Sequence, residues 1–204
     1  MRILALVAAV GAAASLAGCI SVLPKTKPAQ LYSFGGAIAP TATPAPGPRF
    51  SIEVAPISFD RAAVGDRILT TTGNQAAYIK GSRWDVGAQY LFESALTNAF
   101  AADGGPARLM ARGEAVRADY VLKLEVRTFE ARYLQGQGAA PTVVVRVYAA
   151  LAKTGDRALA GERLFTASVP AAENRAGAIA TAFDQAVTQT LGQLAKWADT
   201  RGAG

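Results

Sequence analysis

Cys19 is the only cysteine of this 204-residue chain, and it stands directly behind an apolar run near the N-terminus. The thiolate of cysteine is a nucleophile, so this residue is the first place to look for chemistry. A lone cysteine cannot form a disulfide within its own chain. The residues around Cys19 must therefore indicate what the thiol is used for.

The first 18 residues have the three parts of a bacterial export signal. Arg2 supplies the positive start, residues 3–14 form a short apolar stretch, and residues 15–18 form a small-residue exit. The apolar stretch is shorter than the ~20 residues that span a bilayer. We therefore predict that residues 1–18 are a signal peptide that is removed on export.

Leu16, Ala17, Gly18 and Cys19 form the tetrad Leu-Ala-Gly-Cys, which resembles the lipobox. In that motif the thiol takes a diacylglycerol and the chain is cut just before the cysteine. The resemblance implies that Cys19 becomes the lipidated N-terminal residue, and two or three acyl chains anchor a protein effectively permanently. The alternative is an ordinary secretory signal cut after Ala14 or Ala17, which leaves Cys19 as a free thiol.

Histidine is absent from the sequence, which excludes a Ser-His-Asp triad, a Cys-His pair and any histidine metal site. Several carboxylates are possible acid–base groups, but none stands in a recognisable motif. They are Glu53, Asp60, Asp66, Asp85, Glu93, Glu125, Glu130 and Glu162. We therefore expect no catalytic residue, no metal site and no cofactor apart from the covalent lipid on Cys19.

The basic residues are scattered along the chain. There are 21 Lys and Arg against 15 Asp and Glu, and the net charge of +6 falls to about +5 when Arg2 leaves with the signal. A nucleic-acid groove typically shows basic runs with interleaved aromatic residues, and neither is present. We expect no nucleic-acid partner. A mildly basic surface facing anionic lipid or an acidic partner remains open, although simple solubility explains the charge equally well.

Composition divides the mature chain into a tether and one domain. Residues 19–48 are expected to be a lipidated tether, with a short strand near residues 31–34 and an Ala-, Pro- and Thr-rich loop at 37–48. The domain itself is expected at 49–200, with a tail at 201–204. Removing the signal leaves 186 residues, which is enough for one domain with a proper core.

From Phe50 onward the apolar residues alternate as strands. Residues 50–54 form one strand, and residues 67–71 and 76–79 flank Gly73-Asn74 as a hairpin. Three longer alternating runs at 120–129, 143–151 and 159–169 predict a meander, whose last two strands pair antiparallel across a turn at 153–156.

Two segments change to helical spacing. The first covers 85–102, with Asp85 as the expected N-cap and Gly104-Gly105-Pro106 as the stop; the second covers 173–200. The predicted buried stripes are Ala88, Leu91, Phe92, Ala95, Leu96, Ala99 and Phe100 in the first helix, and Ile179, Phe183, Val187, Thr190, Leu191, Leu194 and Trp197 in the second. We predict an α/β fold of the α+β type: a two-layer sandwich with two main helices on one face of one mixed, largely antiparallel sheet.

The order of these features resembles the ABC-type transport auxiliary lipoprotein family, which includes the C-type lipoprotein of the paraquat-inducible lipid-transport system. After the lipobox and tether come Tyr32-Ser33-Phe34, a strand ending in Val54-Ala55-Pro56, a hairpin, Arg83-Trp84 before a helix, a meander and a last helix. The resemblance spans nearly all of residues 19–200. Phe34 replaces the leucine that the family has in its Tyr-x-Leu patch.

The resemblance implies a non-enzymatic lipoprotein of the bacterial envelope. It would be the auxiliary component of an ABC transporter that moves phospholipids or related apolar molecules between membranes, and it would dock a periplasmic MCE-domain protein. Ile20 stands where enteric inner-membrane lipoproteins have aspartate, which favours the periplasmic face of the outer membrane. Candidate docking residues are Tyr78, Ile79 and Trp84 near the predicted hairpin; packing in the core is the alternative for Tyr78 and Trp84.

Two other functions remain open at this stage. One is a lipid-binding carrier, which would need an apolar cavity between the sheet and the helices. The other is a structural lipoprotein that assists outer-membrane or cell-wall assembly. Neighbouring genes for a permease, an ATPase and an MCE protein would favour transport, whereas cell-wall synthase genes would favour the structural role.

Overall fold

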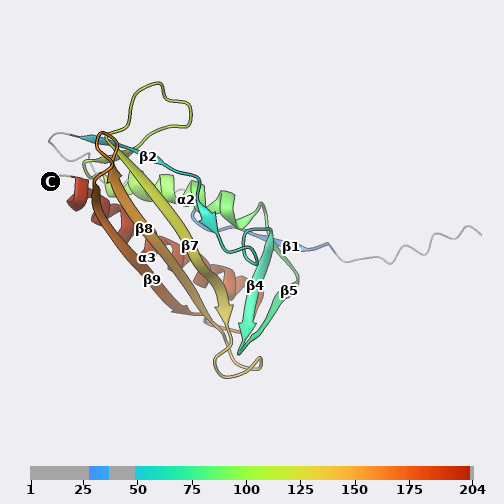
Figure 1. Ribbon diagram of the computed structural model, residues 1–204. Coiled ribbons are helices and arrows are strands. Elements are labelled where there is room, and N and C mark those ends of the chain that lie inside the picture. The colour runs from blue at the N-terminus through green and yellow to red at the C-terminus, as the bar shows by residue number, and fades with distance from the viewer. Residues whose placement is uncertain (1–27, 37–48, 203–204) are drawn as a thin grey trace, which may run out of the picture.

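The longest strand, β7 (Tyr120–Arg132), organises the sheet in the computed structural model, which describes residues 28–36 and 49–202 (Figure 1). The sheet has nine strands of mixed direction, and the two helices lie together behind it. The predicted two-layer α/β sandwich is confirmed. The predicted signal peptide, the lipobox, Cys19 and the loop at 37–48 lie outside the described residues.

One edge of β7 carries the predicted meander. It pairs antiparallel with β8 (Thr142–Lys153), which pairs antiparallel with β9 (Leu159–Pro170). The inward residues of β7, among them Leu122, Leu124 and Val126, are buried. Because side chains alternate across a strand, the intervening Lys123 and Arg127 face solvent.

Three short strands share the other edge of β7, all parallel to it. They are β2 (Phe50–Val54), β3 (Ser58–Phe59) and β4 (Arg67–Thr72), and they pair in turn with residues 120–122, 125–126 and 131–132. β6 (Ala107–Leu109) extends the sheet beyond β2. Neither β3 nor β6 was predicted, because two or three residues are too few to show a period.

The predicted hairpin is confirmed and is longer than expected. β4 pairs antiparallel with β5 (Gln75–Trp84) across Gly73-Asn74, and Gly73 has a φ of +58° that suits its place in the turn. The far end of β5, residues 82–84, pairs in parallel with β1 (Gln30–Tyr32). The short N-terminal strand is thus an edge strand of the main sheet.

The helices are α2 (Ala88–Asp103) and α3 (Ala176–Gly202), and every residue of both predicted stripes is buried. α2 ends at Gly104, whose φ of +67° is the left-handed conformation of a helix C-cap. The prediction that Asp85 is the N-cap was wrong. The Asp85 N–H instead donates to the Tyr32 carbonyl over 2.8 Å, which keeps the chain extended, and the cap position falls to Gly87, which makes no side-chain cap bond.

Aromatic rings join the N-terminal segment to the centre of the core. The Phe34 ring centroid lies 5.0 Å from that of Trp84 and 5.3 Å from that of Phe129. Phe183 of α3 contacts the same group, 5.2 Å from Trp84 and 4.8 Å from Phe129. Such contacts stabilise a core beyond the burial of their area. Neither helix of the described chain is long and apolar enough to cross a membrane.

Candidate functional site

The segment of residues 30–35 is held by both helices. The Gly35 N–H donates to Oδ1 of Asp184 in α3 over 2.7 Å, and the Asn98 side chain of α2 donates to the Gly35 carbonyl over 3.0 Å. Phe34 is buried beside them. Residues 30–35 are therefore part of the folded domain, although the sequence placed them within the tether.

Because residues 30–35 belong to the domain, the chain between Cys19 and the sheet ends at Gln30, the first residue of β1. Eleven residue steps separate Cys19 from Gln30, so the span is at most about 36 Å at ~3.3 Å per residue. A group attached at Cys19 would therefore stay within a few nanometres of β1.

The three candidate docking residues lie along β5, but they have different environments. Trp84 is 1% exposed and packs in the aromatic core, so of its two interpretations the structure supports core packing. Its ring offers no surface to a partner because Phe34 and Phe183 enclose it. Tyr78 and Ile79 are half-buried and pack against the core from the edge of the domain.

Tyr78 is held by polar contacts on two sides. Its hydroxyl donates to the Ala62 carbonyl over 3.0 Å, and the guanidinium of Arg67 lies 3.8 Å from the centre of its ring. A cation placed over an aromatic face is attracted by the ring quadrupole. These two contacts fix the position of the half-buried Tyr78 ring.

The edge of β5 beside Tyr78 and Ile79 has no strand partner within the described chain. β4 pairs with one edge of β5, and β1 covers only residues 82–84 of the other. Residues 75–81 thus keep unpaired backbone groups. Gly81, with a φ of +70°, lies where β1 pairing begins. An exposed edge of this kind is a template for an added strand.

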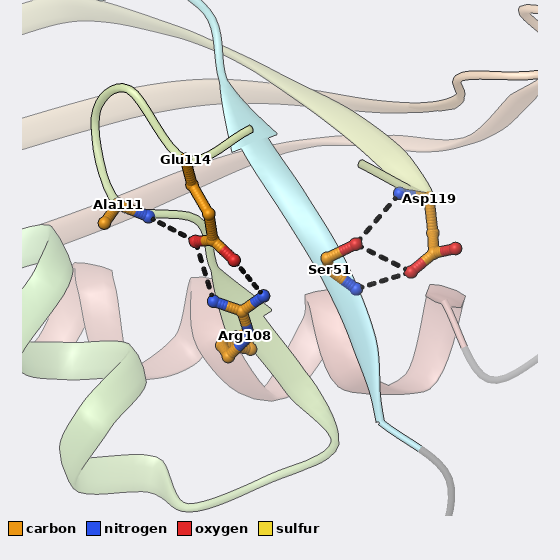
Figure 2. A network of polar contacts seen from close by, with 5 residues as sticks. All are labelled: Ser51, Arg108, Ala111, Glu114 and Asp119. Carbon is orange, nitrogen blue, oxygen red and sulfur yellow. Dashed lines mark hydrogen bonds and ion pairs between the residues drawn. The ribbon is translucent and has the colours of Figure 1, made fainter. Parts of the chain in front are cut away.

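A polar network at another part of the sheet holds the loop between β6 and β7 (Figure 2). Oδ2 of Asp119 accepts bonds from the Ser51 N–H over 2.7 Å and from its hydroxyl over 2.8 Å. Both bonds favour the carboxylate, so they lower the pKa of Asp119.

The same loop is held a second time by Glu114. Its carboxylate accepts two bonds from Arg108, over 2.8 and 3.0 Å, and one from the Ala111 N–H over 3.0 Å. These bonds lower the pKa of Glu114. Figure 2 shows the Asp119 and Glu114 carboxylates accepting these bonds from Ser51, Arg108 and Ala111. The network has a structural role, because it fixes the loop between β6 and β7.

Four of the eight carboxylates that the sequence left as acid–base candidates form ion pairs with neighbouring cations. Asp66, Glu93, Glu125 and Glu130 each pair with an arginine. Glu162 instead accepts a bond from the Tyr148 hydroxyl. No group of three potential metal ligands occurs within residues 28–36 and 49–202.

One carboxylate outside that set has a raised pKa. Asp199 of α3 lies partly buried beside Asp103 at the end of α2, and burial together with this like-charged neighbour raises its pKa to about 6. The Ala107 N–H donates to it over 2.9 Å. Asp199 thereby joins the ends of both helices to β6.

The space between sheet and helices is filled by large side chains. Phe92, Phe129, Phe165, Phe183 and Leu191 are all fully or almost fully buried there. Of the surface hollows, one of about 570 Å³ lies beside Phe50, Tyr120 and Lys153, and another of about 400 Å³ lies beside Thr71 and Tyr133. Both lie at the ends of the long strands, whereas a carrier would need a cavity between the layers.

Comparison with known proteins identifies the family. The family model described as the ABC-type transport auxiliary lipoprotein component matches residues 32–195, so the chain belongs to this family. It is a family of transport accessory proteins, which is not an enzyme class, and membership of a lipoprotein family assigns the chain to the cell envelope. No curated protein matches the chain.

Solved structures agree with the fold. The crystal structure of protein XCC0632 from Xanthomonas campestris is 27% identical, with a TM-score of 0.73 over 86% of this chain and 97% of that one. A second crystal structure, of an uncharacterized protein, is 14% identical, with a TM-score of 0.64 over 84% of this chain and 99% of that one. The second likeness concerns the fold alone.

Proposed function

We propose that this protein is a lipid-anchored docking component of an ABC transporter that moves phospholipids or related apolar molecules between membranes. Its partner would be the periplasmic MCE-domain protein of the system, and its place the periplasmic face of the outer membrane. The observation that carries the proposal is the family match over residues 32–195, because the family is one of ABC-type transport auxiliary components.

The anchor in this proposal is an acylated Cys19 behind Leu16, Ala17 and Gly18. The hydrogen bonds of Gly35 with Asp184 and Asn98 support this anchor. A pulling force on the N-terminus would be resisted by both helices and not by β1 alone. Tethering also raises the local concentration of a docking domain for a partner at the same membrane to about millimolar.

The docking surface in this proposal is the free edge of β5 with Tyr78 and Ile79. A strand of the MCE-domain protein would pair with residues 75–81, where backbone groups lack a partner within the described chain. The two side chains would then supply the apolar contacts, because both are only half-buried. Trp84 would support β5 from inside the core.

The anchor is tested with Cys19→Ala in the full-length protein. Wild-type protein should incorporate labelled palmitate and fractionate with membranes, and the variant should do neither. A variant that still fractionates with membranes, beside a wild type that takes up no label, would show that Cys19 is not the anchor.

The docking surface is tested by co-purification with the MCE-domain protein. Tyr78→Ala combined with Ile79→Ala should weaken binding about tenfold, or ~1.4 kcal/mol, because both residues lie on the proposed edge. Leu159→Ala is the matched control, since Leu159 is an exposed apolar residue on β9. If the double variant melts as a folded protein and still binds with wild-type affinity, β5 is not the docking edge.

A further inference from the structure

The outer edge of β9 is the longest unpaired strand edge in the described part of the chain. β9 has 12 residues and pairs only with β8, so its other edge has no strand partner within residues 28–36 and 49–202. Figure 1 shows β9 as the outermost strand, on the side of the sheet away from β1. An open edge of this length is a template for pairing with another strand.

The register of β8 and β9 shows which backbone groups point to this open edge. The Ala171 N–H donates to the Pro141 carbonyl over 2.9 Å, and these two residues lie opposite each other where the register continues past the strands. Because backbone groups of successive residues point to alternate sides of a strand, the odd-numbered residues of 161–169 bond to β8. The residues whose N–H and C=O groups point outward are Glu162, Leu164, Thr166 and Ser168.

Neither a bulge nor a proline interrupts residues 161–169. The register with β8 is regular over this stretch, and its irregularity lies before Gly161, between Leu151 and Ala152 of β8. Pro170 lacks an N–H and therefore closes the edge at its far end. Glu162 and Arg163 are the only charged residues of the stretch, one of each sign. The stretch thus has no net charge that would repel a second copy of itself.

The remaining segments of the same chain are poor candidates to cover this edge. Residues 37–48 include four prolines, which cannot donate to a strand ladder: Pro40, Pro44, Pro46 and Pro48. Residues 20–27 lead into β1, which lies at the opposite edge of the sheet. The strand that pairs with β9 is therefore expected to come from another chain.

We propose that β9 pairs antiparallel with β9 of a second copy of this protein, about a two-fold axis at Leu164. Leu164 lies near the middle of β9, is 38% exposed, and stands on the opposite face of the strand from the buried Phe165. An axis at this position places the side chain against its own copy and removes apolar surface from water. The inference is independent of acylation at Cys19 and leaves the edge of β5 open.

The sequence of β9 is complementary to itself in this arrangement. Glu162 lies opposite Thr166 of the second copy, and Arg163 lies opposite Phe165 of the second copy. Neither charge therefore stands directly opposite a like charge, which would be destabilising. The Arg163 guanidinium already lies 5.1 Å from the centre of its own Phe165 ring, and the second copy would bring it another aromatic face.

The backbone groups fit the same axis. Glu162, Leu164 and Thr166 all direct their N–H and C=O groups outward, and each lies opposite a residue that does the same. Directly opposed residues of this type exchange two backbone hydrogen bonds. A two-fold axis uses the same edge on both copies, so the contact closes as a dimer and does not propagate.

The first test measures the mass of the full-length lipoprotein in detergent by light scattering, with bound detergent subtracted. Leu164→Lys and Leu164→Glu each place like charges opposite one another, so either variant alone should dimerise at least about tenfold more weakly than the wild type. An equimolar mixture of the two variants should recover the dimer, because opposite charges then meet. This recovery also shows that both variants are folded.

Leu159→Lys is the matched control for the charge substitutions. Leu159 is 59% exposed on the same strand but lies beyond the irregular register at its start. This variant should dimerise like the wild type.

A second test uses Leu164→Cys under mild oxidation. Directly opposed residues of antiparallel strands have Cα atoms about 5.5 Å apart, which is within the range of a disulfide. This variant should form a disulfide-linked dimer, and Leu159→Cys should not. The wild type, whose single cysteine is Cys19, gives the background.

Several results would overturn the proposal. One is a wild type that stays monomeric at about 100 µM, well above the Kd of an ordinary specific interface. Others are an assembly of more than two copies, or a Leu164→Lys protein that dimerises as tightly as the wild type. If the wild type is monomeric and Leu164→Lys instead loses binding to the transport partner, the edge of β9 belongs to that partner and the proposal fails.

Discussion

The backbone N–H of Gly35 donates a 2.7 Å hydrogen bond to Oδ1 of Asp184, a residue 149 positions further along the chain. The bond joins the N-terminal segment to the first third of α3, and the side chain of Asn98 in α2 donates a hydrogen bond to the carbonyl of the same glycine. The first strand of the domain is therefore attached to both helices. This relationship underlies the first two predictions.

Asp184→Ala should lower the free energy of unfolding by about 1–3 kcal/mol, because the partly buried Gly35 N–H loses a charged acceptor. Denaturant unfolding measures the loss, and hydrogen exchange should show faster exchange at residues 30–35. Asp184→Asn is the control, since its carbonyl oxygen can still accept the bond. Unchanged exchange at 30–35 in the alanine variant would mean that the bond does not hold the segment.

Gly35→Ala should cost at least about 2 kcal/mol, because two effects oppose it. Gly35 has a φ of +66°, and a Cβ there would overlap the Cβ of Ala95. Adding Ala95→Gly should relieve the overlap and recover part of the loss in thermal unfolding.

Gly73→Ala is the matched control for this pair. Gly73 has a φ of +58°, but no atom lies within 4 Å of the place that a Cβ would take, so its substitution carries only the backbone cost of about 1 kcal/mol. Equal losses at positions 35 and 73 would show that the contact with Ala95 is unimportant.

Asp199→Asn should stabilise the protein at neutral pH but not at about pH 4. The folded protein raises the pKa of Asp199 from 3.8 to about 6, so the native state binds the proton more tightly than the unfolded state. Stability from this group is therefore highest below the unfolded pKa, falls as the pH rises toward 6, and then stays level.

The expected gain at neutral pH is about 1 kcal/mol, less than the shift alone implies, because solvent screens this partly exposed pair. The asparagine oxygen can still accept the bond from Ala107, so the substitution removes mainly the charge. Urea unfolding across this pH range measures the effect. A constant difference between variant and wild type at every pH would contradict a raised pKa at Asp199.

Ser51→Ala should reduce stability at neutral pH by up to about 1 kcal/mol, with a smaller loss in acid. The Ser51 N–H and hydroxyl lower the pKa of Asp119. Their stabilisation is therefore present above the unfolded pKa of Asp119 and is lost as the pH falls through the folded value. Ser58→Ala, on an exposed position of β3, serves as the control. A loss of stability that does not change with pH would mean that Ser51 does not act through the Asp119 carboxylate.

Local periodicity was enough to predict the long elements. The structure confirms both helical stripes and the β7–β8–β9 meander. They could be predicted because each repeats its apolar pattern over at least nine residues. The start of α2 was misplaced at Asp85, because the choice between extended and helical chain there depends on the Tyr32 carbonyl, 53 positions earlier. The candidate site was predicted only partly: Tyr78 and Ile79 stay predictions, and Trp84 is in the core.

The sequence by itself determined the fold class, the two helix faces and the family, since these depend on composition, on order along the chain and on short-range spacing. Tertiary structure alone decided that three short strands line one edge of β7, that Phe34 and Trp84 meet in one aromatic core, and that Gly35 is held by Asp184. The physical reason is that each of these contacts joins residues far apart in sequence, and no local pattern encodes which distant partner a side chain or strand edge will find.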